Sequence, residues 1–311
     1  MCRIFVSDAS PGRRAFTLVE LLLVLAIVSA LVAILLPALA RGRQQGRSAA
    51  CLSNLRQFLI AWHMYADMHQ DVMMPGRHCY EGAPPADPAS WNFVGNGLKY
   101  CPRGVAMLGG YIGANPFSRP SVSDSRQDYE SRIYQCPEAP EWIDERNSGY
   151  GYNYQFLGNN RRRSPTSRYY NFPVNRSALT ALDRTVVFAD SLGTAAGVAA
   201  DLRRGYLNNG SDPTCVGNHG WSLDPPRLTA TSDRGTFNPS PRTAVDPRHL
   251  RGRVNSAWAD GHGQTDTPYA LGYRLLPSGA YVDLEKVADA PNNRSFSGHD
   301  KDLSPPDKPL N

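Results

Sequence analysis

The chain has 311 residues, of which 41% are hydrophobic and 20% charged, and its formal net charge is +5 at pH 7. This length accommodates a long helix plus one globular head of ~200 residues, which is enough for a sizeable core. The positive charge is almost entirely arginine, because the only lysines are Lys99, Lys286, Lys301 and Lys308. Such a bias is as typical of a GC-rich genome as of a nucleic-acid surface, so net charge alone does not indicate a nucleic-acid partner.

The first predicted element is an apolar helix near the N-terminus. Residues 16–39 form the chain's one long apolar run, and this run exceeds the ~20 residues needed to span a bilayer. Glu20 lies just inside it, although a charge costs at least ~2.5 kcal/mol at the centre of a membrane helix and somewhat less near the boundary. Such a carboxylate needs a reason to be there, so the segment is predicted to do more than anchor the chain.

The residues around Glu20 resemble the N-terminus of type IV pilins and type II secretion pseudopilins. The match consists of the basic pair Arg13-Arg14, the helix residue Pro37, and the run Phe16-Thr17-Leu18-Val19-Glu20-Leu21. The resemblance implies that a membrane prepilin peptidase cleaves between Ala15 and Phe16 and methylates the new amine. The family usually has Gly before the cut, so Ala15 predicts slower processing.

The same resemblance implies a location. The leader, residues 1–15, is expected in the cytoplasm, with a single pass through a bacterial inner membrane and a periplasmic or extracellular head. Charge alone does not fix this orientation, because arginines lie on both sides of the apolar run, at Arg13 and Arg14 before it and at Arg41, Arg43 and Arg47 after it.

Electrostatics supports an assembly role for the segment. After cleavage the amine of Phe16 in one subunit and Glu20 of a neighbour would lie at nearly the same depth, and their pairing offsets both desolvation penalties. Two alternatives remain open. One is a signal-anchor with Glu20 at the headgroup boundary, and the other is a secretory signal peptide cut after Ala38-Leu39-Ala40.

The remaining elements predict an α+β, pilin-like fold: a long N-terminal helix packed on a small antiparallel sheet with long loops. Residues 40–70 are expected to continue the helix as an amphipathic segment, with apolar positions at Leu52, Leu55, Phe58, Leu59, Trp62, Tyr65 and Ala66. Residues 71–288 are expected to form the head, with strands at 133–135, 150–154, 185–189 and 254–259. Residues 289–311 are expected to be a flexible polar tail.

Five cysteines remain after the leader is removed, so at least one is unpaired. An exported head can form disulfides. Cys101 and Cys136, each followed by proline, flank one loop-rich stretch and are the favoured bridge.

A second resemblance covers the head. Residues 51–57, 148–153 and Arg248-His249, followed by Asp260-Gly261-His262, resemble a branch of pilin-like proteins with a His, nine residues and an Asp-Gly near the C-terminus. Ten residues separate His249 from Asp260 here, one more than in that pattern.

The C-terminal motif has two interpretations. Asp260-Gly261 favours a tight hairpin turn after a strand. Alternatively His249, Asp260 and His262, with His219 as a further candidate, would bind a zinc-like ion. Calcium is a separate hypothesis, for which the candidates are Asp183, Asp190, Asp201 and Asp260, although their spacing lacks the alternation of a known calcium loop.

Two aromatic or basic patterns suggest ligands. Residues 161–163 and Arg168 are arginines next to Tyr169 and Tyr170, which resembles a single-strand nucleic-acid surface but is also common in solvated loops. Tyr150, Tyr152 and Tyr154 alternate as in a strand and predict either a core face or a platform for polysaccharide. The chain contains no hydrolase, phosphate-loop or zinc-protease motif, so no catalytic residue and no enzymatic activity are expected.

The sequence therefore predicts a pseudopilin-like structural subunit of a type II secretion-like or type IV pilus-like system. Its expected partners are a prepilin peptidase, other pilin-like subunits and the inner membrane. The alternative is a membrane-tethered or filament-tip module that recognises polysaccharide or DNA.

Overall fold

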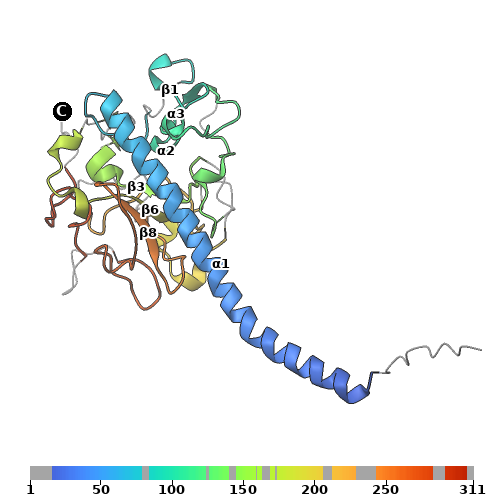
Figure 1. Ribbon diagram of the computed structural model, residues 1–311. Helices are drawn as coiled ribbons and strands as arrows, with labels where there is room; N and C mark the ends of the chain where they lie inside the picture. Colours follow the sequence, from blue (N-terminus) through green and yellow to red (C-terminus); the bar gives the residue numbers. More distant parts are fainter. Residues whose placement is uncertain are drawn as a thin grey trace, which may run out of the picture. The chain divides into compact units, whose positions relative to one another are not determined.

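The computed structural model describes residues 16–78, 84–123, 126–139, 145–158, 160–162, 169–171, 174–205, 212–228, 243–282 and 291–306. The predicted leader, residues 1–15, lies outside the described residues. The chain divides into two compact units, one ending at Gln44 and the other beginning at Gln45. A long N-terminal helix is followed by antiparallel sheets, which confirms the predicted α+β, pilin-like layout (Figure 1).

The helices are α1 (Leu18–Met68), α2 (Gly104–Met107) and α3 (Gly109–Ile112), and short 3-10 or π turns connect several strands. The strands are β1 (Trp91–Phe93), β2 (Leu98–Tyr100), β3 (Tyr150–Tyr152), β4 (Asn160–Arg162), β5 (Tyr169–Asn171), β6 (Val186–Gly193), β7 (Ala244–Val245), β8 (Val254–Trp258) and β9 (Gly263–Asp266).

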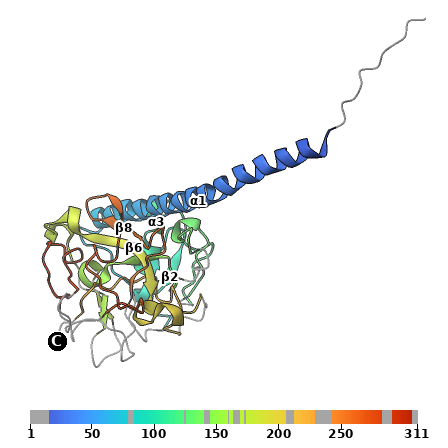
Figure 2. The ribbon, with the colours of Figure 1, turned by 90° about the horizontal axis from the view of Figure 1, so that it is seen from below.

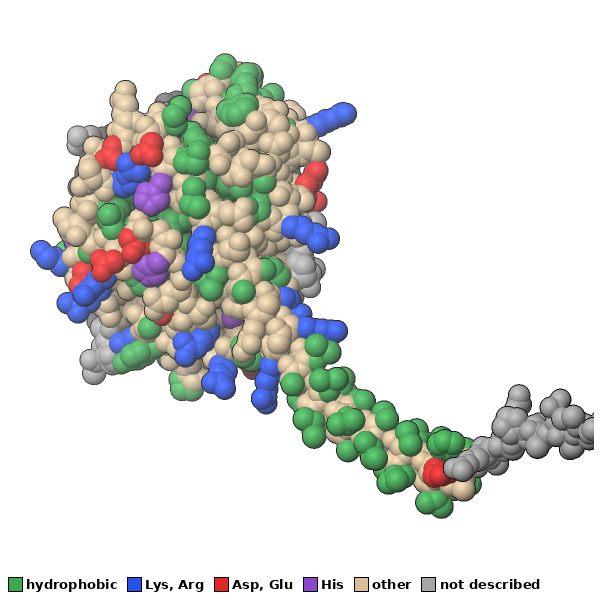
Figure 3. Space-filling view, viewed as in Figure 1, with side chains coloured by type: hydrophobic (Ala, Val, Ile, Leu, Met, Phe, Trp, Pro, Cys, Tyr) green, Lys and Arg blue, Asp and Glu red, His purple; other side chains and the backbone are tan. Residues whose placement is uncertain are grey.

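The first part of α1, as far as Leu39, is apolar on every face. Its leucine, isoleucine and valine side chains are exposed, and Figure 3 shows an almost uniformly hydrophobic surface along this segment. Among the described residues, α1 is the one helix long and apolar enough to cross a membrane. Pro37 lies inside α1 without ending it. These properties fit a single membrane anchor.

The second part of α1 belongs to the head unit and packs one face into its core (Figure 2). The buried residues recur at helical spacing and match the predicted stripe, apart from Leu52, which is half-buried. They are Cys51, Leu55, Phe58, Leu59, Ala61, Trp62, Tyr65 and Ala66. Phe58 lies at the centre, because its ring is within 6.0 Å of the rings of Tyr134, Tyr150 and Phe188.

A central antiparallel sheet provides the other side of this core. Its strands run in the order β3, β6, β8, β9, and β7 pairs with β6. All eight residues of β6 are buried, as expected for a strand with neighbours on both edges and cover on both faces. Three of the four predicted strands are confirmed in part or whole by β3, β6 and β8.

The hairpin between β8 and β9 confirms the predicted turn at Asp260-Gly261. Gly261 has φ of 109°, a conformation that L side chains rarely adopt, and the N–H of Gly261 donates to the carbonyl of Trp258 at 2.9 Å. The pairing continues through Val254 opposite Asp266. The Asp-Gly motif therefore has a structural role in this chain.

Two expectations about secondary structure and order are wrong. Residues 133–135 do not form a strand, because Arg132–Tyr134 is a 3-10 turn. The segment 291–306 is not a flexible tail: Asn293 and Phe296 are completely buried, and the N–H of Val186 donates to the carbonyl of Ser295 at 2.7 Å. This C-terminal segment closes the core next to β6.

Asn153 links three parts of this core. Its Nδ2 donates to the carbonyls of Val186 and Phe296, both at 2.9 Å, and the residue is fully buried. Replacing Asn153 with Ala removes the donor from two buried carbonyls, so we expect Asn153→Ala to lower the free energy of unfolding by ~1–3 kcal/mol. Denaturant unfolding of the full chain in detergent, followed by tryptophan fluorescence, measures this loss.

The matched control for Asn153→Ala is Gln57→Ala, which removes an exposed amide from α1. The control is expected to change the unfolding free energy by less than ~0.5 kcal/mol. Equal stabilities for the two variants would contradict the role assigned to Asn153.

Candidate functional site

The N-terminus of α1 is closed by a reciprocal hydrogen-bond pair. The Oε2 atom of Glu20 accepts from the backbone N–H of Thr17 at 2.9 Å and from its hydroxyl at 2.8 Å. In return, Oγ1 of Thr17 accepts from the backbone N–H of Glu20 at 3.2 Å. This is a capping box, which satisfies two backbone N–H groups that otherwise lack partners.

The capping box gives Glu20 a second, local role. Its sequence signature is the spacing Thr17-x-x-Glu20. The carboxyl group of Glu20 lies near the positive end of the helix dipole, which favours negative charge there. Phe16 and Glu20 are both exposed. The arrangement holds an anion in a fixed orientation at the start of an apolar helix and leaves it without a cationic partner among the described residues.

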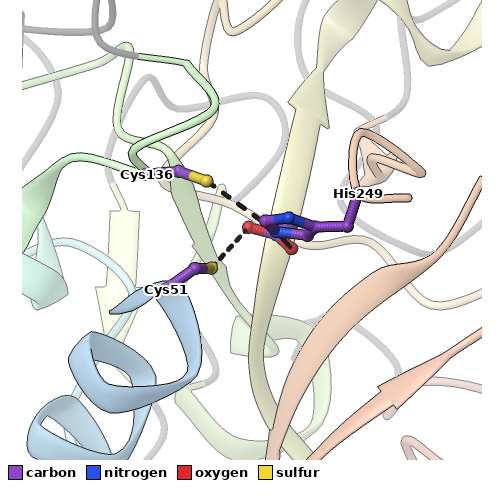
Figure 4. A group of neighbouring side chains, drawn as sticks. Cys51, Cys136 and His249 are labelled. Carbon is purple, nitrogen blue, oxygen red and sulfur yellow. Dashed lines mark hydrogen bonds and ion pairs between the residues drawn. The ribbon is translucent and has the colours of Figure 1, made fainter. Parts of the chain in front are cut away.

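A second group of functional side chains lies in the interior of the head. Cys51 comes from α1, Cys136 follows the Arg132–Tyr134 turn, and His249 lies between β7 and β8 (Figure 4). Asp190 lies on β6. All four are buried, and their ligating atoms lie within 4.8 Å of one another. Among the described residues this is the only such group of three or more His, Cys, Asp or Glu side chains.

Asp190 is the centre of this cluster. The thiol of Cys51 donates to Oδ1 of Asp190 at 3.2 Å, and Nε2 of His249 contacts Oδ2 at 2.9 Å. The backbone N–H of Asn255 on β8 also donates to Oδ2, at 2.8 Å. The Sγ of Cys136 lies 3.9 Å from Nε2 of His249. One ligand atom from each of the four residues therefore faces the same small volume.

Backbone pairing holds the cluster in place. Asp190 is opposite Tyr150 in the β3–β6 register. His249 forms an antiparallel bridge with Arg253, directly before β8 begins. The N–H of Asp246 donates to the carbonyl of Asp190 at 2.9 Å. Residues distant in the chain are thus fixed by neighbouring strands of one sheet.

A buried arginine accompanies the cluster. The Nε of Arg248 lies 3.0 Å from Oδ2 of Asp246, and a guanidinium N–H of Arg248 donates to the carbonyl of Ser191. The positive charge of Arg248 acts on Asp190 and on both thiols. It therefore favours negative charge in the cluster.

Burial and contacts move the pKa values in the cluster in different directions. Burial opposes the charged form of His249, but hydrogen bonds with Asp190 and Cys136 outweigh it and raise its pKa to about 10. The hydrogen bond from Cys51 lowers the pKa of Cys136 to about 6. Burial raises the pKa of Cys51, and the charge of Arg248 helps to hold that of Asp190 below its usual value despite burial.

The cluster does not have the geometry of a Cys-His-Asp catalytic triad. In a triad the carboxylate holds Nδ1 of the histidine while Nε2 faces the nucleophile. Here Asp190 and Cys136 both meet Nε2 of His249, and within the described part of the chain Nδ1 has no hydrogen-bond partner. The thiols are also buried away from any substrate in solution. The arrangement suits a bound ion better than nucleophilic attack.

The metal set predicted from the C-terminal motif is wrong as a group. His249 precedes β8, whereas Asp260 and His262 follow it, and the five residues of β8 at ~3.3 Å each separate them. Asp260 and His262 instead pair with each other, with Nδ1 and Oδ1 2.6 Å apart. His219 lies outside the cluster, and burial lowers its pKa to about 3.

The calcium candidates are not brought together either. Of the four candidates, only Asp190 lies in a group of three or more possible metal ligands in the described part of the chain. Asp183, Asp201 and Asp260 do not. Asp183 instead lies 3.8 Å from Arg184, and both side chains are exposed.

The predicted disulfide between Cys101 and Cys136 is also wrong. Cys101 is disulfide-bonded, whereas Cys136 is a free cysteine. The reason is local, since the thiol of Cys136 faces His249 and Cys51 inside the cluster. The other cysteine of the cluster, Cys51, is likewise free and buried.

The aromatic and basic patterns are placed as follows. Tyr150, Tyr152 and Tyr154 are buried, which confirms the core interpretation over the polysaccharide platform. The backbone segments 160–162 and 169–171 pair as β4 and β5. Arg163 and Arg168 lie outside the described residues.

Comparison with known proteins gives one result. The family model for the Prokaryotic N-terminal methylation motif matches residues 11–36, a span that includes Phe16 and Glu20. No curated protein and no solved structure matches the chain.

Proposed function

We propose that this chain, which carries the prepilin-type N-terminal methylation motif of the type IV pilin and pseudopilin family, is a structural subunit that assembles into a filament. A prepilin peptidase would cleave it between Ala15 and Phe16. The observation that carries the proposal is the motif at residues 11–36 combined with an exposed Glu20 at the start of an apolar helix.

The physical basis is charge pairing in a medium of low polarity. Cleavage creates a cationic amine at Phe16, which is costly in a bilayer unless an anion pairs with it. Glu20 of a neighbouring subunit supplies that anion at nearly the same depth. The pair would fix how far adjacent helices are displaced along the filament axis, with the capping box presenting the carboxylate in one orientation.

The machine to which we assign the subunit is a type II secretion-like or type IV pilus-like system. Its partners would be a prepilin peptidase and other pilin-like subunits, and it would be stored in the inner membrane with its head in the periplasm or outside the cell. The alternative is a tethered module that binds polysaccharide or DNA. Burial of Tyr150, Tyr152 and Tyr154 removes one argument for it.

Processing is the first test of the proposed function. Intact mass of the membrane-extracted chain, produced with and without a prepilin peptidase, is expected to give a species beginning at methylated Phe16 only when the peptidase is present. Ala15→Gly restores the residue usual in the family and is expected to be cleaved faster. A chain that begins at Met1 under both conditions would instead identify a plain signal-anchored protein.

A further inference from the structure

The buried cluster of Cys51, Cys136, Asp190 and His249 has the dimensions of a metal site. In a tetrahedral zinc site, with Zn–S near 2.3 Å and Zn–N or Zn–O near 2.0–2.2 Å, neighbouring ligand atoms lie roughly 3.3–3.8 Å apart. Here the contacts are 2.9 Å from His249 to Asp190, 3.2 Å from Cys51 to Asp190 and 3.9 Å from Cys136 to His249. These separations bracket the tetrahedral values.

The donor atoms select the kind of metal. Calcium prefers six to eight oxygen ligands and magnesium a near-octahedral shell of oxygens, whereas this cluster offers two sulfurs, one imidazole nitrogen and one carboxylate. Thiolate and imidazole together in a four-ligand set are typical of zinc. The donor set therefore rules against the calcium hypothesis and favours zinc.

The surrounding charge suits a divalent cation. With both thiols deprotonated, Cys51, Cys136 and Asp190 carry three negative charges, and a divalent ion leaves one. Arg248 lies close enough to act on all three of these groups, while it also pairs with Asp246. A metal would thus replace the protons of the two thiols. The positive side chain of Arg248 would then balance the one negative charge that remains.

The position of the cluster indicates what the ion would do. Structural zinc sites have four protein ligands and no open position, and all four side chains here are buried. We propose that Cys51, Cys136, Asp190 and His249 bind one Zn²⁺ ion as a closed structural site, which fastens α1 to β6 and to the segments carrying Cys136 and His249. This proposal does not depend on filament assembly.

Metal content of the full chain, extracted from membranes without chelators, tests the proposal. Elemental analysis and native mass are expected to show one zinc per chain. Cys51→Ser and Cys136→Ser are expected to weaken zinc binding on the order of 100-fold or more, because each removes a ligand. Cys215→Ser, which changes a buried cysteine outside the cluster, is the matched control and is expected to bind zinc like the wild type.

A second measurement covers the case in which a cluster variant does not fold. Replacing zinc by Co²⁺ in the wild-type chain is expected to give the intense visible absorption of a tetrahedral site with thiolate ligands. A Cys51–Cys136 disulfide in the isolated protein, identified as a cross-linked peptide in a non-reducing digest, would overturn the proposal. So would reduced thiols that take up neither zinc nor cobalt, another metal in place of zinc, or full zinc binding by Cys51→Ser.

Discussion

Glu20→Ala is expected to leave cleavage by a prepilin peptidase largely intact and to abolish incorporation into filaments. The variant removes the anion that would pair with the amine of Phe16 in a neighbouring subunit, so each added subunit would bury an unpaired charge. It also removes the capping box, but loss of a cap costs only ~1 kcal/mol and α1 has 51 residues. The ratio of filament to membrane-stored protein, measured after shearing and fractionation, checks the prediction.

Two further variants separate the charge of Glu20 from its capping role. Glu20→Gln keeps an oxygen that can accept from Thr17 but has no charge, and it is expected to fail in assembly like Glu20→Ala. Thr17→Ala removes the hydroxyl that bonds Glu20 but leaves the carboxylate, and it is expected to assemble. Normal assembly of Glu20→Gln would show that charge pairing is not the basis of the filament.

Glu145→Ala is expected to be the most destabilising of the substitutions proposed in the head. Glu145 and Lys99 are both completely buried, with Nζ and Oε2 3.6 Å apart, and Oε1 of Glu145 accepts from the backbone N–H of Arg103 at 2.8 Å. The variant removes the carboxylate next to Lys99 and the acceptor of the Arg103 N–H, both in the interior, and a loss of this kind costs ~3–5 kcal/mol. Denaturant unfolding in detergent, followed by tryptophan fluorescence, measures the loss.

The control for Glu145→Ala is Glu145→Gln, which keeps the acceptor for Arg103 and loses only the charge.

Burial raises the pKa of Glu145 in spite of the nearby Lys99 and Arg103. The raised pKa means that Glu145 contributes most to stability at pH below its unfolded pKa, and that this contribution declines as pH rises through the folded value. Glu145→Gln should therefore remove this pH dependence and cost less than Glu145→Ala. A larger loss for Gln than for Ala would contradict this account.

The parts of the fold that follow from short-range patterns could be predicted from the sequence. The apolar run, the stripe through Phe58 and Trp62, and the hairpin turn at Gly261 each depend on residues a few positions apart. The C-terminal segment could not be predicted in this way. Its polar composition indicates a tail, and contacts with residues far away in the sequence fix it, among them the packing of Phe296 in the core and the hydrogen bond from Val186 to Ser295.

The buried cluster could be predicted only in part, for a related reason. Cys51 and His249 lie in motifs noticed in the sequence, but their partners Cys136 and Asp190 have no local spacing that joins them. Neighbouring strands bring Asp190 and His249 together, and α1 supplies Cys51 from far earlier in the chain. The local pattern of His249 with Asp260 was misleading because an extended strand separates its two ends.

The packing of α1 also determines when the head can become stable. Trp62 lies on a helix face whose partners in β3 and β6 come much later in the chain, and the core is closed last by Phe296. At ~5–20 residues per second, synthesis from residue 66 to residue 296 takes roughly 10–50 seconds, whereas a helix forms within ~1 μs. The apolar face of α1 is therefore present well before β3, β6 and Phe296 are synthesised to cover it, and a membrane surface or chaperone that shields the nascent chain would act there.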